Sequence, residues 1–274
     1  MHYRSEFPFL PAILLAACAS TTWAQASTST PSTPGDYRIT FTNEGGSDLT
    51  LTPLWFAFQD GGFDLFNPGE SPTAGLELLA EDGDPSVLIG EFNAAAQPGN
   101  RQGVVLAPAG FPGAPVVEPG ETGVAYITAT SPASYQYFSF ASMVIPSNDT
   151  FIGNPDPLQY QVFDASGAIN DPSGVFTIQV FAANFWDAGT ELNNGQGAAF
   201  STIGGSPTDT NDGIGAAGDL TEFLGTTTPS GLTINNLPGS ADLVATITIS
   251  QVPEPASWVC VLLSVAPAVT RRWR

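Results

Sequence analysis

Residues 37–42, Tyr-Arg-Ile-Thr-Phe-Thr, decide the fold class of this chain. Apolar side chains occupy every second position, so one face of the segment is apolar and the other is polar. A period of two residues is typical of a β-strand that is buried on one face. Residues 243–250 repeat the pattern, with an apolar face made of Leu243, Ala245, Ile247 and Ile249. Both ends of the central region therefore predict strands.

Strand-like segments fill much of the sequence between these two. They are residues 49–52, 54–58, 104–106, 123–129, 138–145 and 175–182. Pro53 predicts an edge strand or a bulge at its position, because proline cannot donate a hydrogen bond to a neighbouring strand. The 29 Gly and 24 Pro residues suit many turns, and strands do not alternate with helices along the chain. We therefore predict an all-β domain, folded as an antiparallel β-sandwich.

Helix is expected to be scarce, with one or two short helices at most. Residues 74–81 place Leu76, Leu79 and Ala80 at helical spacing, and Gly83 supplies a typical stop. The stretch over residues 195–238 is rich in Gly, Thr and Asn. It predicts long loops with one hairpin at most.

The charge is distributed unevenly along the chain. The net charge is −20, from 26 acidic residues against six basic ones. Between Ser27 and Val252 only Arg38 and Arg101 are basic, whereas every acidic residue except Glu6 and Glu254 lies there. Such a surface repels nucleic acid and anionic lipid over about 8–10 Å, the Debye length near physiological salt. We expect no nucleic-acid partner.

The same region lacks the residue types of common catalytic sites. The only histidine is His2, the two cysteines are Cys18 and Cys260, and the chain has no lysine. Without these types the region cannot form a Ser-His-Asp or Cys-His site, a Schiff base, a His-ligated zinc site or a disulfide. Carboxylates, hydroxyls and the backbone remain. We therefore predict a binding protein and not an enzyme.

The N-terminus has the features of a secretory signal peptide. Arg4 precedes an apolar run over residues 7–19, and small residues follow. The run is shorter than the roughly 20 residues of a membrane-spanning helix. We predict a cleaved signal peptide over residues 1–26. Residues 15–18, Leu-Ala-Ala-Cys, leave acylation of Cys18 as an alternative.

The C-terminus has three parts. Pro253-Glu254-Pro255 precedes an apolar run over residues 256–269 and a basic end over residues 271–274. This arrangement resembles the PEP-CTERM sorting signal, which implies processing by an exosortase in a Gram-negative bacterium. It also implies that residues 251–274 anchor the chain transiently in the inner membrane, before release or attachment at the cell surface. A short permanent anchor is the alternative, although the apolar run would rise only about 21 Å as a helix.

One folded region remains between the two ends. Residues 27–35 have the Ser/Thr/Pro composition of a flexible linker. The sequence shows no internal repeat. We therefore place a single domain at residues 36–250.

Three segments of this domain resemble one known family. They are Asp60-Gly-Gly-Phe-Asp-Leu-Phe66, Ala141-Ser-Met-Val-Ile-Pro-Ser-Asn-Asp149 and Asn184-Phe-Trp-Asp-Ala-Gly-Thr-Glu191. In this order they resemble the spondin N-terminal domain, over about residues 36–250. The resemblance implies a C2-like antiparallel β-sandwich. Animal members of the family are calcium-binding adhesion proteins of the extracellular matrix.

The resemblance implies calcium ligands at Asp149, Asp187 and Glu191, although animal members usually have Asp at the last position. Ca²⁺ prefers oxygen ligands, and clustered carboxylates repel one another without a cation. If residues 187–191 were extended, the two end residues would lie about 13 Å apart. A turn at residues 188–190 is therefore needed to bring them together. Acids that are simply solvated are the alternative.

Other candidate site residues have simpler explanations. Asp60 and Asp64 flank a Gly-Gly turn, which favours a turn cap over a second ion site. Residues 209–213 resemble part of an EF-hand loop, but the spacing of the acids is wrong. Trp186, beside the expected ion, suggests a ligand contact. We expect the neighbouring aromatic residues Trp55, Phe56, Phe58, Phe63 and Phe66 to lie in a buried core.

These expectations combine into one functional hypothesis. We expect an exported binding or adhesion protein of the cell surface or extracellular matrix, stabilised by Ca²⁺. The PEP-CTERM resemblance implies a matrix rich in exopolysaccharide, so the expected partner is exopolysaccharide or another component of the envelope or matrix. A structural matrix protein without a selective partner is one alternative. A glycoside hydrolase that uses Asp149 and Asp187 is a weaker one.

Overall fold

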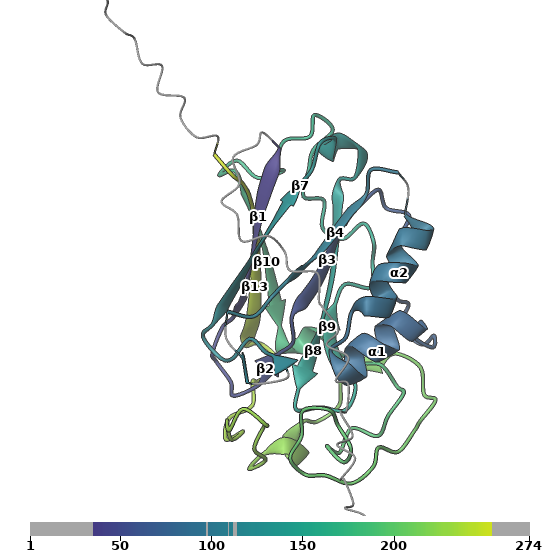
Figure 1. Cartoon of the computed structure of the whole chain (residues 1–274), viewed down its shortest axis with the longest axis vertical. Helices are drawn as coiled ribbons and strands as arrows, with labels where there is room; N and C mark the ends of the chain where they lie inside the picture. Colours follow the sequence, from purple (N-terminus) through teal and green to yellow (C-terminus); the bar gives the residue numbers. More distant parts are fainter. Residues whose placement is uncertain (1–34, 97, 109, 112–113, 254–274) are drawn as a thin grey trace, which may run out of the picture.

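The computed structural model describes residues 35–96, 98–108, 110–111 and 114–253 (Figure 1). It contains two large antiparallel sheets, so the predicted all-β sandwich is confirmed. The predicted signal peptide with Cys18, most of the linker, and the sorting tail from Glu254 onward lie outside the described residues. No helix of the described part is long and apolar enough to cross a membrane.

The first sheet has four strands in the order β10-β13-β1-β7. Their bounds are β1 (Asp36–Asn43), β7 (Thr122–Thr128), β10 (Val175–Phe181) and β13 (Leu243–Gln251). Ile39 lies opposite Ile249, and Phe41 lies opposite Ile247. The two segments with the clearest sequence alternation are therefore neighbours, and their apolar faces lie side by side in the core.

The second sheet follows the order β12-β11-β9-β8-β3-β4, and β2 also pairs with β8. Its strands are β2 (Thr50–Leu51), β3 (Leu54–Gln59), β4 (Arg101–Val105), β8 (Tyr137–Ile145), β9 (Thr150–Gly153), β11 (Phe185–Asp187) and β12 (Gly215–Ala216). Two short strands, β5 (Gly110–Phe111) and β6 (Ala114–Pro115), form a separate hairpin. Pro53 lies between β2 and β3 and separates the two strands. It does not mark an edge, because β3 has a strand on each side.

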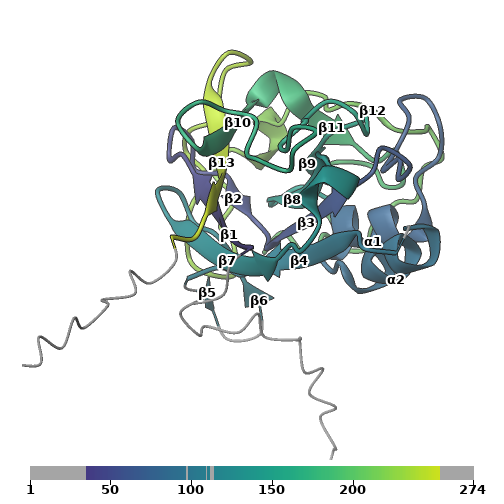
Figure 2. The ribbon, with the colours of Figure 1, turned by 90° about the horizontal axis from the view of Figure 1, so that it is seen from above.

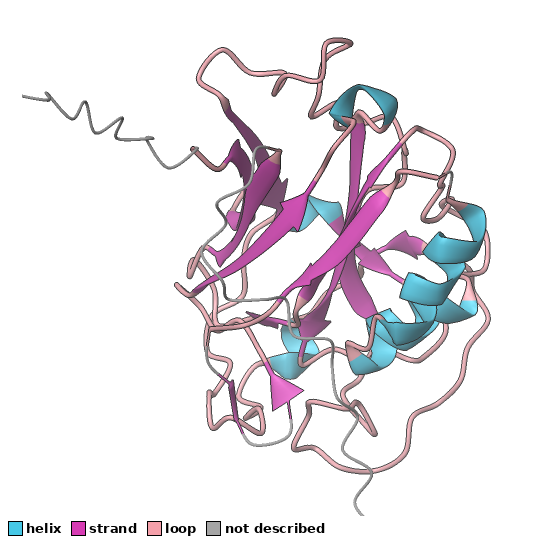
Figure 3. Cartoon of the chain, turned by 45° about the horizontal axis from the view of Figure 1, so that its top comes forward, coloured by secondary structure: helices cyan, strands magenta, loops and turns pink. Residues whose placement is uncertain are grey.

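Two large apolar cores hold the layers together, and a small third cluster contains Val116, Met143, Ile145 and Phe200. The main core lies between the sheets and contains Phe56 and Phe58. A second core lies on the outer face of the larger sheet, where Trp55 packs under α1 (Ala74–Asp82) and α2 (Ser86–Ala95) (Figure 3). All six residues of β3 are buried, because both faces of this strand are covered. The prediction that Trp55, Phe56, Phe58, Phe63 and Phe66 belong to the core is confirmed.

Helix α1 confirms the prediction for residues 74–81, and α2 was not predicted. The Thr73 hydroxyl accepts a hydrogen bond from the Leu76 N–H, and Gly83 ends α1 with a φ of 66°. Helix α2 has Pro85 at its N-cap and contains Gly90, so its sequence signal is weak. Its first N–H, that of Ser86, donates to Asp84 Oδ1 over 2.8 Å. The two helices pack against each other, which places α1 beside β8 and β9.

Long loops connect the remaining elements. Short 3₁₀ helices lie at Pro132–Ser134, Ala182–Asn184 and Thr221–Phe223. The predicted small hairpin forms around the bridge between Thr227 and Thr233. Seen from above, β4 and β7 lie together on one side, and the chain passes from β10 to β11 on the other (Figure 2).

Candidate metal-binding site at an acidic loop cluster

Strand pairing brings Asp149 and Asp187 together. Asp149 directly precedes β9, and Asp187 is the last residue of β11. In the antiparallel ladder Asp187 lies opposite Thr150, and the Ala188 N–H donates to the Asp149 carbonyl over 3.1 Å. Two carboxylates that are far apart in sequence are thus neighbours at one end of the larger sheet.

The two side-chain oxygens of Asp149 have different environments. Oδ2 accepts hydrogen bonds from the backbone N–H groups of Thr190 (3.0 Å) and Glu191 (3.1 Å). Oδ1 is buried and has no hydrogen-bond partner among the described residues. The whole residue is 0% exposed. A buried carboxylate oxygen without a partner is costly, and a bound cation is one group that would satisfy it.

The electrostatic surroundings of Asp149 disfavour its negative charge. Burial, followed by the charge of Asp187, raises the pKa of Asp149 to about 6, against the opposing hydrogen bonds from Thr190 and Glu191. No basic residue is among these causes. Arg38 and Arg101, the only basic residues between residues 35 and 253, lie on β1 and β4.

Asp187 is held by the turn that follows it. Its Oδ1 accepts a hydrogen bond from the Gly189 N–H over 2.8 Å, and Gly189 has a φ of 72°. Burial raises the pKa of Asp187; hydrogen bonds from Gly189 and Asn193 oppose this shift, and the charge of Asp212 adds to it. The predicted turn at residues 188–190 is therefore present.

The Glu191 side chain has its own partner, Asn148, and is not bonded to this pair. Its carboxylate accepts a hydrogen bond from Asn148 Nδ2 over 3.0 Å, and the charges that raise its pKa, after burial, are those of Asp209, Asp82 and Glu77. The turn brings the Glu191 backbone N–H to Asp149, but the charge of Glu191 is not among the causes that shift the pKa of Asp149. Glu191 as a calcium ligand stays a prediction.

Asn148 is a structural residue that the sequence did not single out. It is 0% exposed, and its Oδ1 accepts hydrogen bonds from the N–H groups of Asn194 (3.1 Å) and Gly195 (2.6 Å). Its Nδ2 donates to Glu191 and to the Gln196 carbonyl. Asn148 therefore ties the loop after β11 to the residue next to Asp149.

A polar cavity of about 340 Å³ lies beside the carboxylate pair. Helix α1 contributes Glu77 and Glu81 to its lining, and the loops contribute Thr190, Glu191 and Asp209. Burial raises the pKa of Glu81 to about 7; a hydrogen bond with the Thr190 hydroxyl opposes the shift, and the charges of Glu191, Glu77 and Asp149 add to it. The i, i+4 spacing of Glu77 and Glu81 is a signal that could have placed both on one face of the predicted helix.

We call Glu77, Glu81, Asp149, Asp187, Glu191 and Asp209 the acidic cluster. Among the described residues, no three Asp, Glu, His or Cys side chains are arranged as ligands of one metal ion. The fit to a hard cation rests instead on the buried Oδ1 of Asp149, with Asp187 next to it. Both residues supply the oxygen donors that Ca²⁺ prefers.

The other candidate residues have structural roles. Asp60 Oδ1 accepts the Gly62 N–H over 3.0 Å, which confirms the turn cap. The Asp64 side chain makes no hydrogen bond within the described residues. Residues 209–213 form a loop, as predicted. Trp186 is partly buried, and its ring packs edge-on against Phe66 with centroids 5.2 Å apart.

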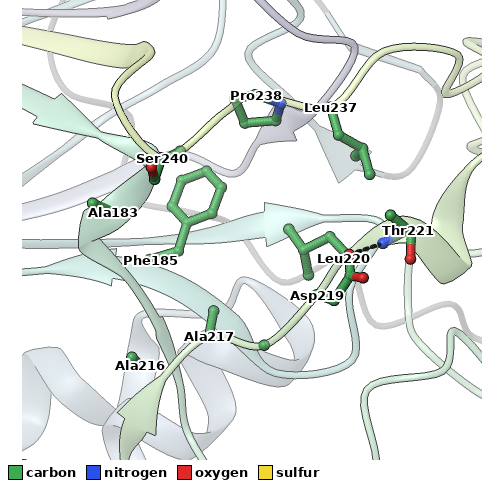
Figure 4. Close-up of a pocket in the computed structure, with 12 residues that line it drawn as sticks. Ala183, Phe185, Ala216, Ala217, Asp219, Leu220, Thr221, Leu237, Pro238 and Ser240 are labelled. Atoms are coloured by element: carbon green, nitrogen blue, oxygen red, sulfur yellow. Dashed lines mark hydrogen bonds between the residues drawn. The ribbon is translucent and has the colours of Figure 1, made fainter.

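A second cavity, of about 310 Å³, is more apolar. Figure 4 shows Phe185, Leu220, Leu237 and Pro238 around it. Its single carboxylate, Asp219, accepts a hydrogen bond from the Thr221 N–H over 2.9 Å and so caps a short helix. The acidic cluster is therefore the stronger candidate for a binding site.

The fold and the cluster define a class of protein, an antiparallel β-sandwich with carboxylates gathered beside one sheet end. A comparison with protein-family models found no match, and a comparison with curated proteins found no significant similarity. The resemblances to the spondin N-terminal domain and to the PEP-CTERM signal therefore stay predictions from the sequence.

Proposed function

We propose that this chain is an exported binding or adhesion protein of the cell surface or extracellular matrix, in which Ca²⁺ orders the loops around the acidic cluster. Asp149 and Asp187 are the central ligands. Glu191 becomes a third ligand if its carboxylate gives up the hydrogen bond from Asn148 and binds the ion instead. The tail is processed at Pro253-Glu254-Pro255 by an exosortase-type enzyme.

The observation that carries this proposal is the partnerless Oδ1 of Asp149. A protein normally satisfies a buried polar atom, and a carboxylate oxygen next to a second carboxylate needs a cation most. Ca²⁺ would supply positive charge there and connect β9 to the loop after β11. Ordered loops at one end of a rigid sandwich are a common way to build a binding surface.

The expected partner is an anionic or neutral polysaccharide. The chain carries a net charge of −20, so an anionic polymer would be repelled unless a divalent cation bridges the two. We therefore expect binding to glycans that depends on Ca²⁺. A glycan array probed with and without Ca²⁺ measures this. Binding in neither condition would favour a structural matrix protein, and release of sugar products would favour a hydrolase.

The burial of Asp149 weighs against the hydrolase alternative. A catalytic carboxylate must contact the glycosidic bond or a water molecule beside it. Asp149 is 0% exposed and is held by two backbone N–H groups.

Thermal unfolding tests the calcium site. Saturating Ca²⁺ should raise the melting temperature by about 5–10 °C over protein in EDTA, since a ligand at 100 times its Kd contributes about 2.7 kcal/mol. In the Asp187→Asn variant this shift should disappear, because a ligand is lost.

Glu44→Gln is a matched control for that measurement. Glu44 is exposed on the loop after β1 and makes no side-chain hydrogen bond in the described structure, so the substitution removes the same charge away from the cluster. It should keep the full calcium shift. If the unmodified protein melts at the same temperature with Ca²⁺ and with EDTA, the proposed site does not exist.

A further inference from the structure

Strand β10 is an edge strand without the features that usually prevent edges from pairing. It lies at the end of the four-stranded sheet, and among the residues that the structure describes β13 is the only strand that pairs with it. Proteins protect edges with lysine, proline, inward-facing charges or very short strands. β10 has seven residues, Val-Phe-Thr-Ile-Gln-Val-Phe, and contains none of these residues. A bulge occurs only at its end, between Val180 and Phe181.

The other edge strands of the two main sheets are either short or covered. β12 ends the larger sheet and has only two residues. β4 ends the same sheet on the other side, but it packs beside β7, the last strand of the smaller sheet (Figure 2). β10 is therefore the one long edge of the two main sheets, within the described residues, that has neither kind of protection.

The sheet register shows which backbone groups of β10 point outwards. The Val252 N–H donates to the Asp36 carbonyl over 2.9 Å, so this residue faces β1. In antiparallel pairs, successive residues direct their N–H and C=O groups to alternate sides. Odd-numbered residues of β13 therefore face β10. Since Ile247 pairs with Ile178, the even-numbered residues of β10 bond to β13.

Thr177 and Gln179 consequently direct their backbone groups away from the sheet. None of these N–H and C=O groups has a hydrogen-bond partner among the residues that the structure describes. Both side chains are exposed on the outer face of the sheet. The edge thus presents two free donors and two free acceptors at the middle of a regular strand.

The sequence of β10 is self-complementary about its central residue. In an antiparallel pair of two β10 strands centred on Ile178, Thr177 lies opposite Gln179 of the second copy. Phe176 then lies opposite Val180, so that apolar residues meet on the inner face and polar residues meet on the outer face. Thr177 and Gln179 have the same orientation of backbone groups, as a hydrogen-bonded antiparallel pair requires.

Charge also favours a second copy at this edge. The strands β7, β10 and β13 contain no charged residue, and β1 contains only Asp36 and Arg38. Two chains with a net charge of −20 repel each other, and the uncharged sheet is where they can approach most closely. An uncharged edge in so acidic a chain therefore favours pairing with a second copy of the same chain.

We propose that β10 is a homodimerisation edge, at which two copies join their four-stranded sheets into one continuous sheet of eight strands. The contact is isologous, with a twofold axis at Ile178. A pairing through one strand buries little surface, so the dimer is weak and reversible. This inference is independent of the calcium site.

Sedimentation of the purified protein tests the proposal. The weight-average mass should rise from that of a monomer toward that of a dimer between micromolar and near-millimolar protein. High salt should strengthen the association, because the Debye length falls from about 8 Å at 0.15 M to about 3 Å at 1 M and screens the repulsion. Over the same range, hydrogen exchange of the Thr177 and Gln179 amides should slow.

A double variant and a matched control locate the contact. Thr177→Lys combined with Gln179→Lys places four ammonium groups at the centre of the paired edge, and it should keep the protein monomeric. Thr122→Lys combined with Tyr126→Lys adds the same charge at exposed positions of β7, on the same face of the sheet, and should still dimerise. The melting temperatures of both variants report whether they fold.

Three outcomes would overturn the proposal. The first is a protein that stays monomeric over the whole concentration range. The second is a folded Thr177/Gln179 variant that still dimerises, which would place the contact elsewhere. The third is a dimer in which the Thr177 and Gln179 amides exchange as fast as in the monomer.

Discussion

Without divalent cations, the protein should lose stability as the pH rises from about 4 to about 7. The pKa of Asp149 is about 6 and that of Glu81 is about 7 in the folded chain, above the ordinary values of 3.8 and 4.5. The folded state therefore binds more protons than the unfolded state in this range, and stability falls with rising pH. The stabilisation is complete at pH values below the ordinary pKa values, and it is lost as the pH rises through the pKa values of the folded state.

Asp149 should account for up to about 3 kcal/mol of this loss, because each pKa unit corresponds to about 1.4 kcal/mol. Glu81 should contribute less than its shift suggests, since solvent screens a partly exposed group. Urea unfolding in EDTA at several pH values measures the free energy of unfolding. Saturating Ca²⁺ should flatten or reverse the slope, because the bound ion favours the ionised carboxylates.

The Asp149→Asn variant separates the two groups. The asparagine side chain does not titrate, so the slope in EDTA should fall to the part contributed by Glu81 and by the other carboxyl groups with raised pKa values, among them Asp187 and Glu191. Glu44→Gln should keep the full slope of the unmodified protein. An Asp149→Asn protein with an unchanged slope would mean that the stability loss comes from other groups.

Much of the fold followed from local sequence pattern. β1 alternates strictly and β13 alternates except at Val244, and each strand has one apolar face on the core. β3 was predicted as a strand over residues 54–58, although Pro53 suggested an edge or a bulge, and its apolar run is covered on both faces. For these strands the local pattern and the tertiary environment agree.

Elements that depend on their neighbours were not predicted. β9 and β11 have four and three residues, too few to show a period, and they exist because they pair with each other and with β8. Helix α2 has proline and not a polar residue at its N-cap, and it relies on the burial of Leu88 and Phe92. Such elements are stabilised by contacts that the sequence of the element does not contain.

The candidate site was predicted in part for the same reason. The sequence pointed to Asp149 and Asp187, and the ladder between β9 and β11 places them together. The direction of the Glu191 side chain depends on Asn148, which local spacing does not reveal. The position of Glu81 depends on how α1 packs on the larger sheet, so no pattern within the three family-like segments could have shown it.

The Gly189→Ala substitution should strongly destabilise the acidic cluster. Gly189 has a φ of 72°, and a Cβ atom there would lie 2.4 Å from the Gly213 carbonyl oxygen. The obstacle is backbone and cannot rotate away. Gly189 also joins the two loops, because its carbonyl accepts hydrogen bonds from the Thr210 hydroxyl (2.8 Å) and the Asp212 N–H (3.0 Å). We expect a loss of about 2–4 kcal/mol in the free energy of unfolding.

Gly204→Ala separates the clash from the backbone strain. Gly204 has a φ of 73°, but a Cβ atom there would have nothing within 4 Å. It should lose only the roughly 1–2 kcal/mol of a left-handed alanine and keep the calcium shift of the melting temperature. Gly189→Ala should lose that shift as well. The alanine keeps the backbone N–H, but the clash with Gly213 moves that N–H away from Asp187, which it holds in place. Equal losses in the two variants, with the calcium shift intact in both, would show that contact with Gly213 does not position Asp187.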